Sequence, residues 1–165
     1  MIGGDVAFVR SRLNLAHYFP LAEDQSRAIG IGWRAGVAWP LGSTERLPLQ
    51  ERFFNGGEDS VRSFREGELG PLDASRDPLG GESYHTLNME LRQKLQGNLW
   101  GSTFIDAGSV GLRANDLFGD LRWGTGVGLH YLLPVGALRL DCAWNPDARP
   151  RESDFQVFLT VGMAF

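Results

Sequence analysis

The sequence predicts an all-β chain that forms a portion of an antiparallel transmembrane β-barrel. Apolar and polar residues alternate along several segments long enough to cross a bilayer, and glycine is abundant, at 22 of 165 residues. A barrel wall alternates apolar outward and polar inward side chains, which keeps its mean hydropathy close to that of a soluble protein. Since no run of about 18 apolar residues is present, the sequence offers no transmembrane helix.

The carboxy-terminal segment, about residues 154–165, shows the alternation most clearly. Large apolar side chains occupy its odd positions, and the even positions are mostly small or polar. A strand of about eleven residues suits a tilted transmembrane strand, whereas strands of soluble sandwiches typically have about five or six. We therefore expect a membrane-targeting terminal strand. Its apolar face consists of Phe155, Val157, Leu159, Val161, Met163 and Phe165.

Six further segments alternate, two of them (5–18 and 98–111) more weakly, which predicts seven strands, or eight if residues 42–55 add one. Along residues 121–133, for example, Trp123 and Leu129 share one face, while Arg122, His130 and several glycines share the other. Charge on one face and hydrocarbon on the other predict a polar lumen, because a soluble barrel would pack its apolar face inward. The inner glycines allow the strands to coil, or allow another segment to approach their backbone closely. The six segments are 5–18, 27–41, 83–95, 98–111, 121–133 and 135–145.

The connections between these segments differ greatly in length. Short turns are expected at residues 96–98 and 133–136, whereas about forty residues, 42–82, separate two strands. Loops of that length are usually functional or disordered. In outer-membrane barrels the short turns face the periplasm and the long loops face outward.

The long connection and the strands after it carry a series of motifs. FFNGG at residues 53–57 leads into VRSF at 61–64, Glu90 follows on the next strand, and FIDAG occupies 104–108. In this order the motifs resemble the BamA/TamA superfamily of outer-membrane assembly factors (the bacterial surface antigen family), most closely its TamA branch. The loop motif comprises Phe53, Gly56, Gly57, Val61, Arg62, Ser63 and Phe64. The strand motif comprises Phe104, Asp106 and Gly108.

The resemblance implies that the long loop enters the barrel, where Arg62 meets Glu90 and Asp106. The alternation independently places Glu90 on the polar face, which Asp106 can share. An arginine drawn into a confined lumen needs bidentate carboxylate partners to offset its desolvation. Ser63 departs from the glycine usual in the family, which bears on the tightness of the turn.

The resemblance also implies a function without catalysis: insertion or translocation of unfolded β-barrel or autotransporter substrates through a lateral seam. The family barrel has sixteen strands and follows periplasmic POTRA domains in the Gram-negative outer membrane. Residues 1–165 would be the carboxy-terminal part of that barrel, in contact with the lipid bilayer. No signal-peptide pattern opens the sequence, so Met1 is expected not to be the natural start. A second copy of the chain is one way to close the open edges.

Three alternatives within and beyond the family remain open. These are a two-partner secretion transporter, a barrel fused to a passenger enzyme such as a patatin, and a passive porin or adhesin. We expect no catalytic residue, cofactor or metal, because the three histidines and single cysteine lack ligand spacing. A hydrolase would require serine and histidine to converge in the fold. The net charge of −4 gives no footprint for nucleic acid.

Overall fold

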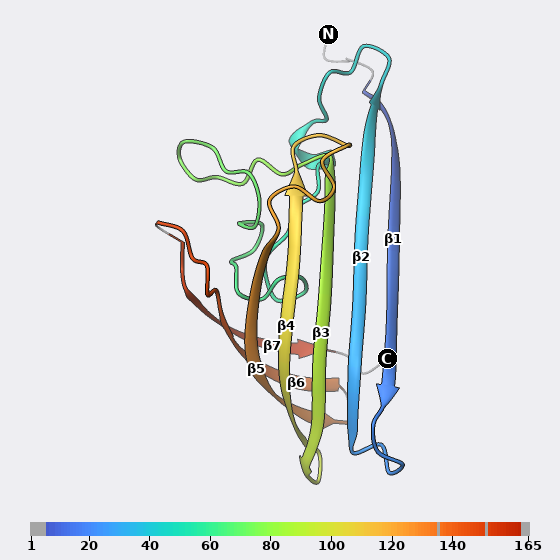
Figure 1. Cartoon of the computed structure of the whole chain (residues 1–165), viewed down its shortest axis with the longest axis vertical. Coiled ribbons are helices and arrows are strands. Elements are labelled where there is room, and N and C mark those ends of the chain that lie inside the picture. Colours follow the sequence, from blue (N-terminus) through green and yellow to red (C-terminus); the bar gives the residue numbers. More distant parts are fainter. Residues whose placement is uncertain (1–5, 135, 151, 163–165) are drawn as a thin grey trace.

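Seven antiparallel strands form one sheet, in chain order, in the computed structural model, which describes residues 6–134, 136–150 and 152–162 (Figure 1). The predicted all-β fold and strand number are confirmed. Among the described residues, β1 and β7 are the sheet edges and do not pair with each other. The strands are β1 (Ala7–Pro20), β2 (Arg27–Leu41), β3 (Ser83–Gln96), β4 (Leu99–Gly111), β5 (Arg122–Leu133), β6 (Gly136–Trp144) and β7 (Phe155–Gly162).

The short and long connections lie at opposite ends of the sheet (Figure 1). At one end, β3 and β4 are joined by a two-residue hairpin in which Gly97 takes a φ of +56°. Glycine adopts this left-handed conformation readily, which suits such tight hairpins. At the other end lie the connections 42–82, 112–121 and 145–154. The long loop therefore enters the fold from the same end as two shorter loops.

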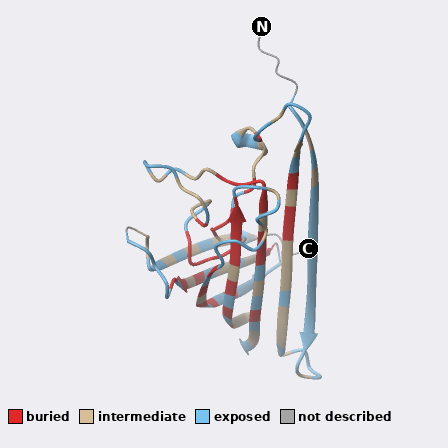
Figure 2. Cartoon of the chain, turned by 45° about the horizontal axis from the view of Figure 1, so that its top comes forward, coloured by how far each residue is buried: buried red, intermediate tan, exposed pale blue. Residues whose placement is uncertain are grey.

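The two faces of the sheet differ as the alternation predicts. On β5, Arg122 and His130 are 4% and 7% exposed, whereas Trp123 and Leu129 are 43% and 47% exposed. The loops cover one side of the sheet, above the strands in which buried residues are most frequent (Figure 2). We call this the inner face. Large apolar side chains point away from it into the surroundings, the reverse of a soluble barrel.

The apolar core is small and lies between the long loop and the inner face. Val61, Phe64 and Leu69 of the loop pack with Val110 of β4. A second group joins Leu47 and Phe53 to Ala38 of β2, and Tyr84 packs against both groups. Burial of these side chains holds the loop against the sheet, since each large apolar group removed from water contributes about 1.5–3 kcal/mol.

Two sequence-based expectations need qualification. The eighth strand considered over 42–55 is absent: Pro48 precedes a 3-10 turn, η1 (Leu49–Glu51), and Phe53 forms one isolated bridge with Gly81. Proline lacks an N–H for a ladder, and Leu47 and Phe53 are drawn into the inner core instead. The terminal strand is described to Gly162, so Met163 and Phe165 lie outside the described residues. Within these ranges, no helix has the length and apolar character needed to span a membrane.

Candidate functional site

The tip of the long loop turns sharply before it meets the inner face. Gly56 and Gly57 have φ values of +102° and +104°, a region that favours glycine because it lacks a Cβ. A β-carbon on Gly56 would lie 2.5 Å from the Arg65 carbonyl oxygen. Gly57 N–H donates to Phe64 O at 3.0 Å, and Phe64 N–H donates to Val61 O at 3.1 Å. The glycine pair thus allows residues 61–64 to form a compact turn.

Ser63 fits this turn without strain. The described non-glycine residues with positive φ are Gln25 and Arg76, so Ser63 does not need the backbone freedom of glycine. Its side chain is buried and faces Gly124 of β5, where an added β-carbon would lie 1.9 Å from Ser63 Oγ. Because Gly124 has no side chain, the Ser63 side chain can pack directly against the backbone of β5. Of the two roles expected for the inner glycines, Gly124 shows the close approach of another segment.

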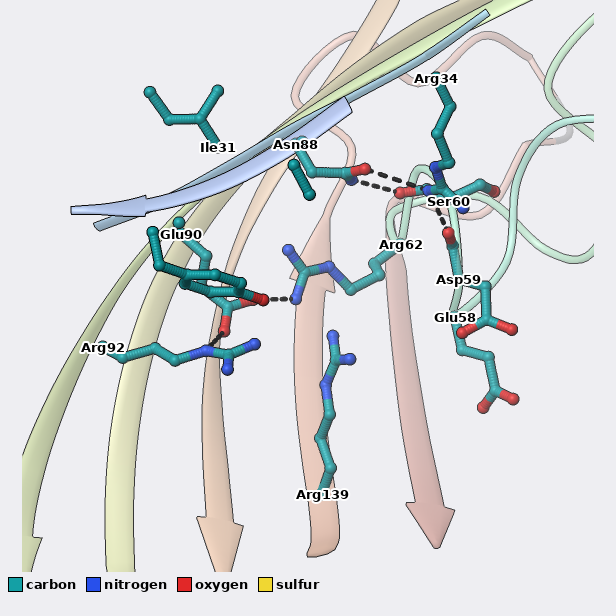
Figure 3. A pocket seen from close by; sticks show the side chains of 14 residues that line it. Ile31, Arg34, Glu58, Asp59, Ser60, Arg62, Asn88, Glu90, Arg92 and Arg139 are labelled. Atoms are coloured by element: carbon teal, nitrogen blue, oxygen red, sulfur yellow. Dashed lines mark hydrogen bonds and ion pairs between the residues drawn. The ribbon is translucent and has the colours of Figure 1, made fainter. Parts of the chain in front are cut away.

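Arg62 lies at the centre of a buried ion-pair cluster. Its Nε and Nη2 donate to Asp106 Oδ2 and Oδ1 at 2.7 and 2.9 Å, and its Nη1 donates to Glu90 Oε2 at 2.7 Å. Arg62 is 3% exposed and Asp106 is fully buried. Figure 3 shows the guanidinium pointing from the loop toward Glu90 on β3. The structure thus brings together Arg62, Glu90 and Asp106.

Three further residues complete the surroundings of Arg62. Asp141 Oδ2 lies 3.4 Å from Arg62 Nη1, and the Phe104 ring centroid lies 3.3 Å from its guanidinium carbon. Asn88 donates to Asp106 Oδ1 at 2.7 Å. From the sequence, Phe104 was expected only as part of the strand motif, with no contact assigned to it. Asp141 and Asn88 were not predicted as site residues. Their available signal was a polar position on the inner face of an alternating strand.

The cluster balances its charges. Arg92 donates to Glu90 at 2.6 Å and Arg139 lies 2.5 Å from Asp141, so three arginines accompany three carboxylates. Burial by itself would lower the pKa of Arg62, but the adjacent carboxylates of Asp106 and Glu90 outweigh it and raise that pKa. Buried ions need such partners because desolvation is costly.

A domain model described as the Omp85 superfamily domain matches residues 1–165, the whole chain. The chain belongs to the Omp85 superfamily. The predicted membership of the outer-membrane assembly-factor superfamily is thereby confirmed. The placement nearest the TamA branch stays a prediction from the motifs.

Several relatives match this Omp85 chain over most of its length. The outer membrane protein assembly factor BamA of Neisseria meningitidis serogroup B is 24% identical over 99% of the chain, which spans 24% of that protein. The sorting and assembly machinery component 50 homolog of Mus musculus is 29% identical over 81% of the chain, which spans 34% of that protein. The chain thus corresponds to about a quarter to a third of these relatives.

A solved structure shows the same fold. The crystal structure of BamA from Haemophilus ducreyi, lacking POTRA domains 1–3, superposes with a TM-score of 0.79 at 20% sequence identity. The match covers 98% of this Omp85 chain and 36% of the other. At this identity the likeness concerns the fold: one curved portion of a larger β-structure.

A serine and a histidine do converge on the inner face of the Omp85 sheet. Ser102 Oγ lies 3.1 Å from His130 Nε2, and Glu90 Oε1 and Asp141 Oδ1 each lie 3.9 Å from the same nitrogen. A hydrolytic triad needs its carboxylate on the opposite ring nitrogen, where it orients the imidazole. This geometry instead makes His130 a neighbour of two Arg62 partners. The described residues include no group of three or more His, Cys, Asp or Glu that could hold a metal ion.

The loop is also fastened away from Arg62. Asn55 Nδ2 donates to the carbonyl of His85 at 2.9 Å, and Thr160 Oγ1 of β7 donates to Glu58 Oε2 at 2.6 Å. Arg34 of β2 donates to the carbonyl of Asp59. The loop of the Omp85 chain therefore bridges strands from β2 to β7 across the inner face.

Proposed function

We propose that this chain is the carboxy-terminal portion of an outer-membrane barrel that inserts or translocates other outer-membrane proteins without catalysis. The observation that carries the proposal is the docking of Arg62 between acids of β3, β4 and β6 on the inner face. Relatives are named as an outer membrane protein assembly factor and as sorting and assembly machinery components. The large apolar side chains of the opposite face suit a lipid bilayer.

In this proposal Arg62 braces the lumen. The loop alone would be a long flexible segment, and its closure against the sheet costs conformational entropy. The cluster offsets this cost by joining the loop to three strands, β3, β4 and β6. A braced loop keeps the lumen blocked and the wall in register while other strands move.

The seam is the second element of the proposal. β7 pairs with β6 on one side, and its other edge has no strand partner among the described residues. An extended substrate segment can add to such an edge through main-chain hydrogen bonds. We place this seam in the Gram-negative outer membrane, with unfolded β-barrel or autotransporter chains as substrates. The remaining strands of a sixteen-stranded barrel, or a second copy of the chain, would complete the wall.

The test uses the full-length gene product reconstituted in liposomes. Arg62→Ala should lower the yield of a folded reporter barrel by at least about tenfold, because it leaves buried carboxylates unpaired, a loss of roughly 3–5 kcal/mol. Charge reversal at Glu90 or Asp106 should give the same result. Arg65→Ala, an exposed arginine three residues away, is the control and should retain activity.

Two outcomes would contradict the proposal. Full assembly by Arg62→Ala, with a loop as resistant to protease as in the parent, would remove the bracing role. Ion conductance by the parent protein without any reporter assembly would favour a passive porin.

A further inference from the structure

A second buried arginine, Arg122, is the first residue of β5, at the end of the sheet where the long loops lie. Its side chain is 5% exposed, and it is not part of the Arg62 cluster. Nη1 and Nη2 donate to Glu152 Oε1 and Oε2 at 3.2 and 2.8 Å, forming a two-pronged pair. Nη2 also donates to the carbonyl of Asp147 at 2.7 Å. Both partners belong to the connection 145–154, so Arg122 fastens this loop to the wall.

The same guanidinium contacts the long loop. Its central carbon lies 5.0 Å from the ring centroid of Phe64, the last residue of the Arg62 turn. A cation over an aromatic face is attracted to it, more strongly where water is excluded. Phe64 is 4% exposed and packs with Val61 and Val110. Arg122 therefore contacts the last residue of the turn from the end of β5 where the loops lie.

Glu152 is itself held in place by its own loop. Its Oε2 also accepts the backbone N–H of Arg149 at 2.9 Å, and the Glu152 side chain is 13% exposed. The carboxylate thus joins one turn of the loop to β5. Glu152 is therefore linked to Phe64 through Arg122 by two direct interactions, a hydrogen-bonded ion pair and a cation–π contact.

We propose that Arg122 is a positioning residue for the Arg62 turn, and that the 145–154 loop acts as a strap over it. Arg62 fixes the turn from the lumen side through carboxylates on the strands. Arg122 fixes it from the loop end of β5, also on the inner face. There the arrangement is reversed, since the arginine is on a strand and the carboxylate is on a loop. Release of the strap frees Phe64 and lowers the cost of withdrawing Arg62. The consequence for assembly rests on the proposed function, whereas the holding of the turn does not.

The same loop offers a matched control. Arg149 forms a closer two-pronged pair with Asp120, at 2.6 and 2.7 Å, which joins the 145–154 loop to the 112–121 loop. These two side chains are 50% and 58% exposed. Exposed pairs contribute little to stability. Loss of the Arg149 side chain therefore removes a loop-to-loop ion pair and leaves the Arg122–Phe64 contact in place.

The test is limited trypsin digestion of the full-length protein in liposomes, following cleavage after Arg65, which is exposed and next to the turn. Heat-modifiable migration confirms that each variant is folded. Arg122→Met, which keeps the apolar stem, should speed cleavage by at least about tenfold, since opening of the turn becomes easier. Arg122→Lys should fall between Met and the parent, because an ammonium keeps the charge and loses the fork.

The remaining variants define what supports and what overturns the strap. Glu152→Gln should also speed cleavage, and Arg122→Met/Glu152→Gln should cleave no faster than Arg122→Met, as expected for one shared interaction. Arg149→Met should cleave like the parent. Unchanged cleavage in folded Arg122→Met would overturn the proposal, as would an equal effect of Arg149→Met. If Arg122→Met does not fold, Glu152→Gln decides. Faster cleavage with full reporter assembly would uphold the strap and contradict the link to the proposed function.

Discussion

Arg62 depends on geometry as well as on charge. Its Nε and Nη2 engage both oxygens of Asp106, its Nη1 reaches Glu90, and its plane lies over Phe104. A guanidinium can satisfy all of these contacts at once because it is planar and carries five donors. A lysine ammonium is a single point that can occupy only part of this site.

Arg62→Lys therefore tests the geometry separately from the charge. We expect the loop to dock less firmly, with a loss of about 2 kcal/mol from the missing fork and ring contact. The measurement is the trypsin cleavage rate after Arg65 in liposomes, compared with Arg62→Ala. Protection equal to the parent would mean that positive charge alone holds the loop.

The contact between Ser63 and Gly124 makes a second residue-level prediction. A methyl group on Gly124 would lie 1.9 Å from Ser63 Oγ and 2.2 Å from its Cβ. Gly124→Ala should displace the turn at a cost of about 1–3 kcal/mol, measured by urea unfolding of the reconstituted protein. Ser63→Gly removes these two atoms and leaves the Trp144 carbonyl oxygen at 2.8 Å, so it should restore part of the loss. The control is Gly32→Ala, where the nearest atoms lie 4.0 Å away; an equal loss there would indicate a general effect of strand glycines.

At the scale of elements, the strands could be predicted because a period of two is a local property. On β5, the opposite faces of Trp123 and Leu129 and of Arg122 and His130 could be predicted without knowing which strands are neighbours. The cluster needed more, since Asp141 approaches Arg62 only through the register that pairs β6 with β5 and β5 with β4. Motif resemblance supplied Glu90 and Asp106. The strap of residues 145–154 contains no motif. The role of Glu152 could not be predicted, because it depends on the ion pair with Arg122 that only the fold brings together.

The tie between the loop and β7 gives an element-level prediction. Thr160 Oγ1 donates to Glu58 Oε2, across 102 residues of sequence. Thr160→Val keeps the shape and removes the donor, so docking of the loop should weaken by about 1–2 kcal/mol. In this variant, both the hydrogen-exchange rate of the β7 amides and the rate of cleavage after Arg65 should rise. Thr103 of β4 faces outward, so Thr103→Val should change neither the β7 exchange rates nor the cleavage rate. Equal effects of the two substitutions would mean that β7 is not specifically coupled to the loop.

At the scale of the whole molecule, the two faces of the sheet require different surroundings. The inner face pairs its charges with one another and is covered by the loop, so it needs little from outside. The outer face presents large side chains, Val127 among them, that are about half exposed. Under the proposed function, removal of these side chains from water by the bilayer supplies the driving force for insertion. The bilayer then completes the fold in the way that a core completes a soluble domain.

Val127→Arg tests this directly. Val127 is 47% exposed and lies midway along β5 on the outer face. In lipid the substitution should destabilise the barrel by about 2–4 kcal/mol, as charged groups do near the bilayer midplane. The measurement is the yield and urea resistance of folded protein in liposomes. Leu112→Arg is the control, because Leu112 is equally exposed, at 46%, but lies in the 112–121 loop and should tolerate the charge. If both variants fold as well as the parent, the outer face is not in lipid, and a soluble all-β domain would account for the alternation instead.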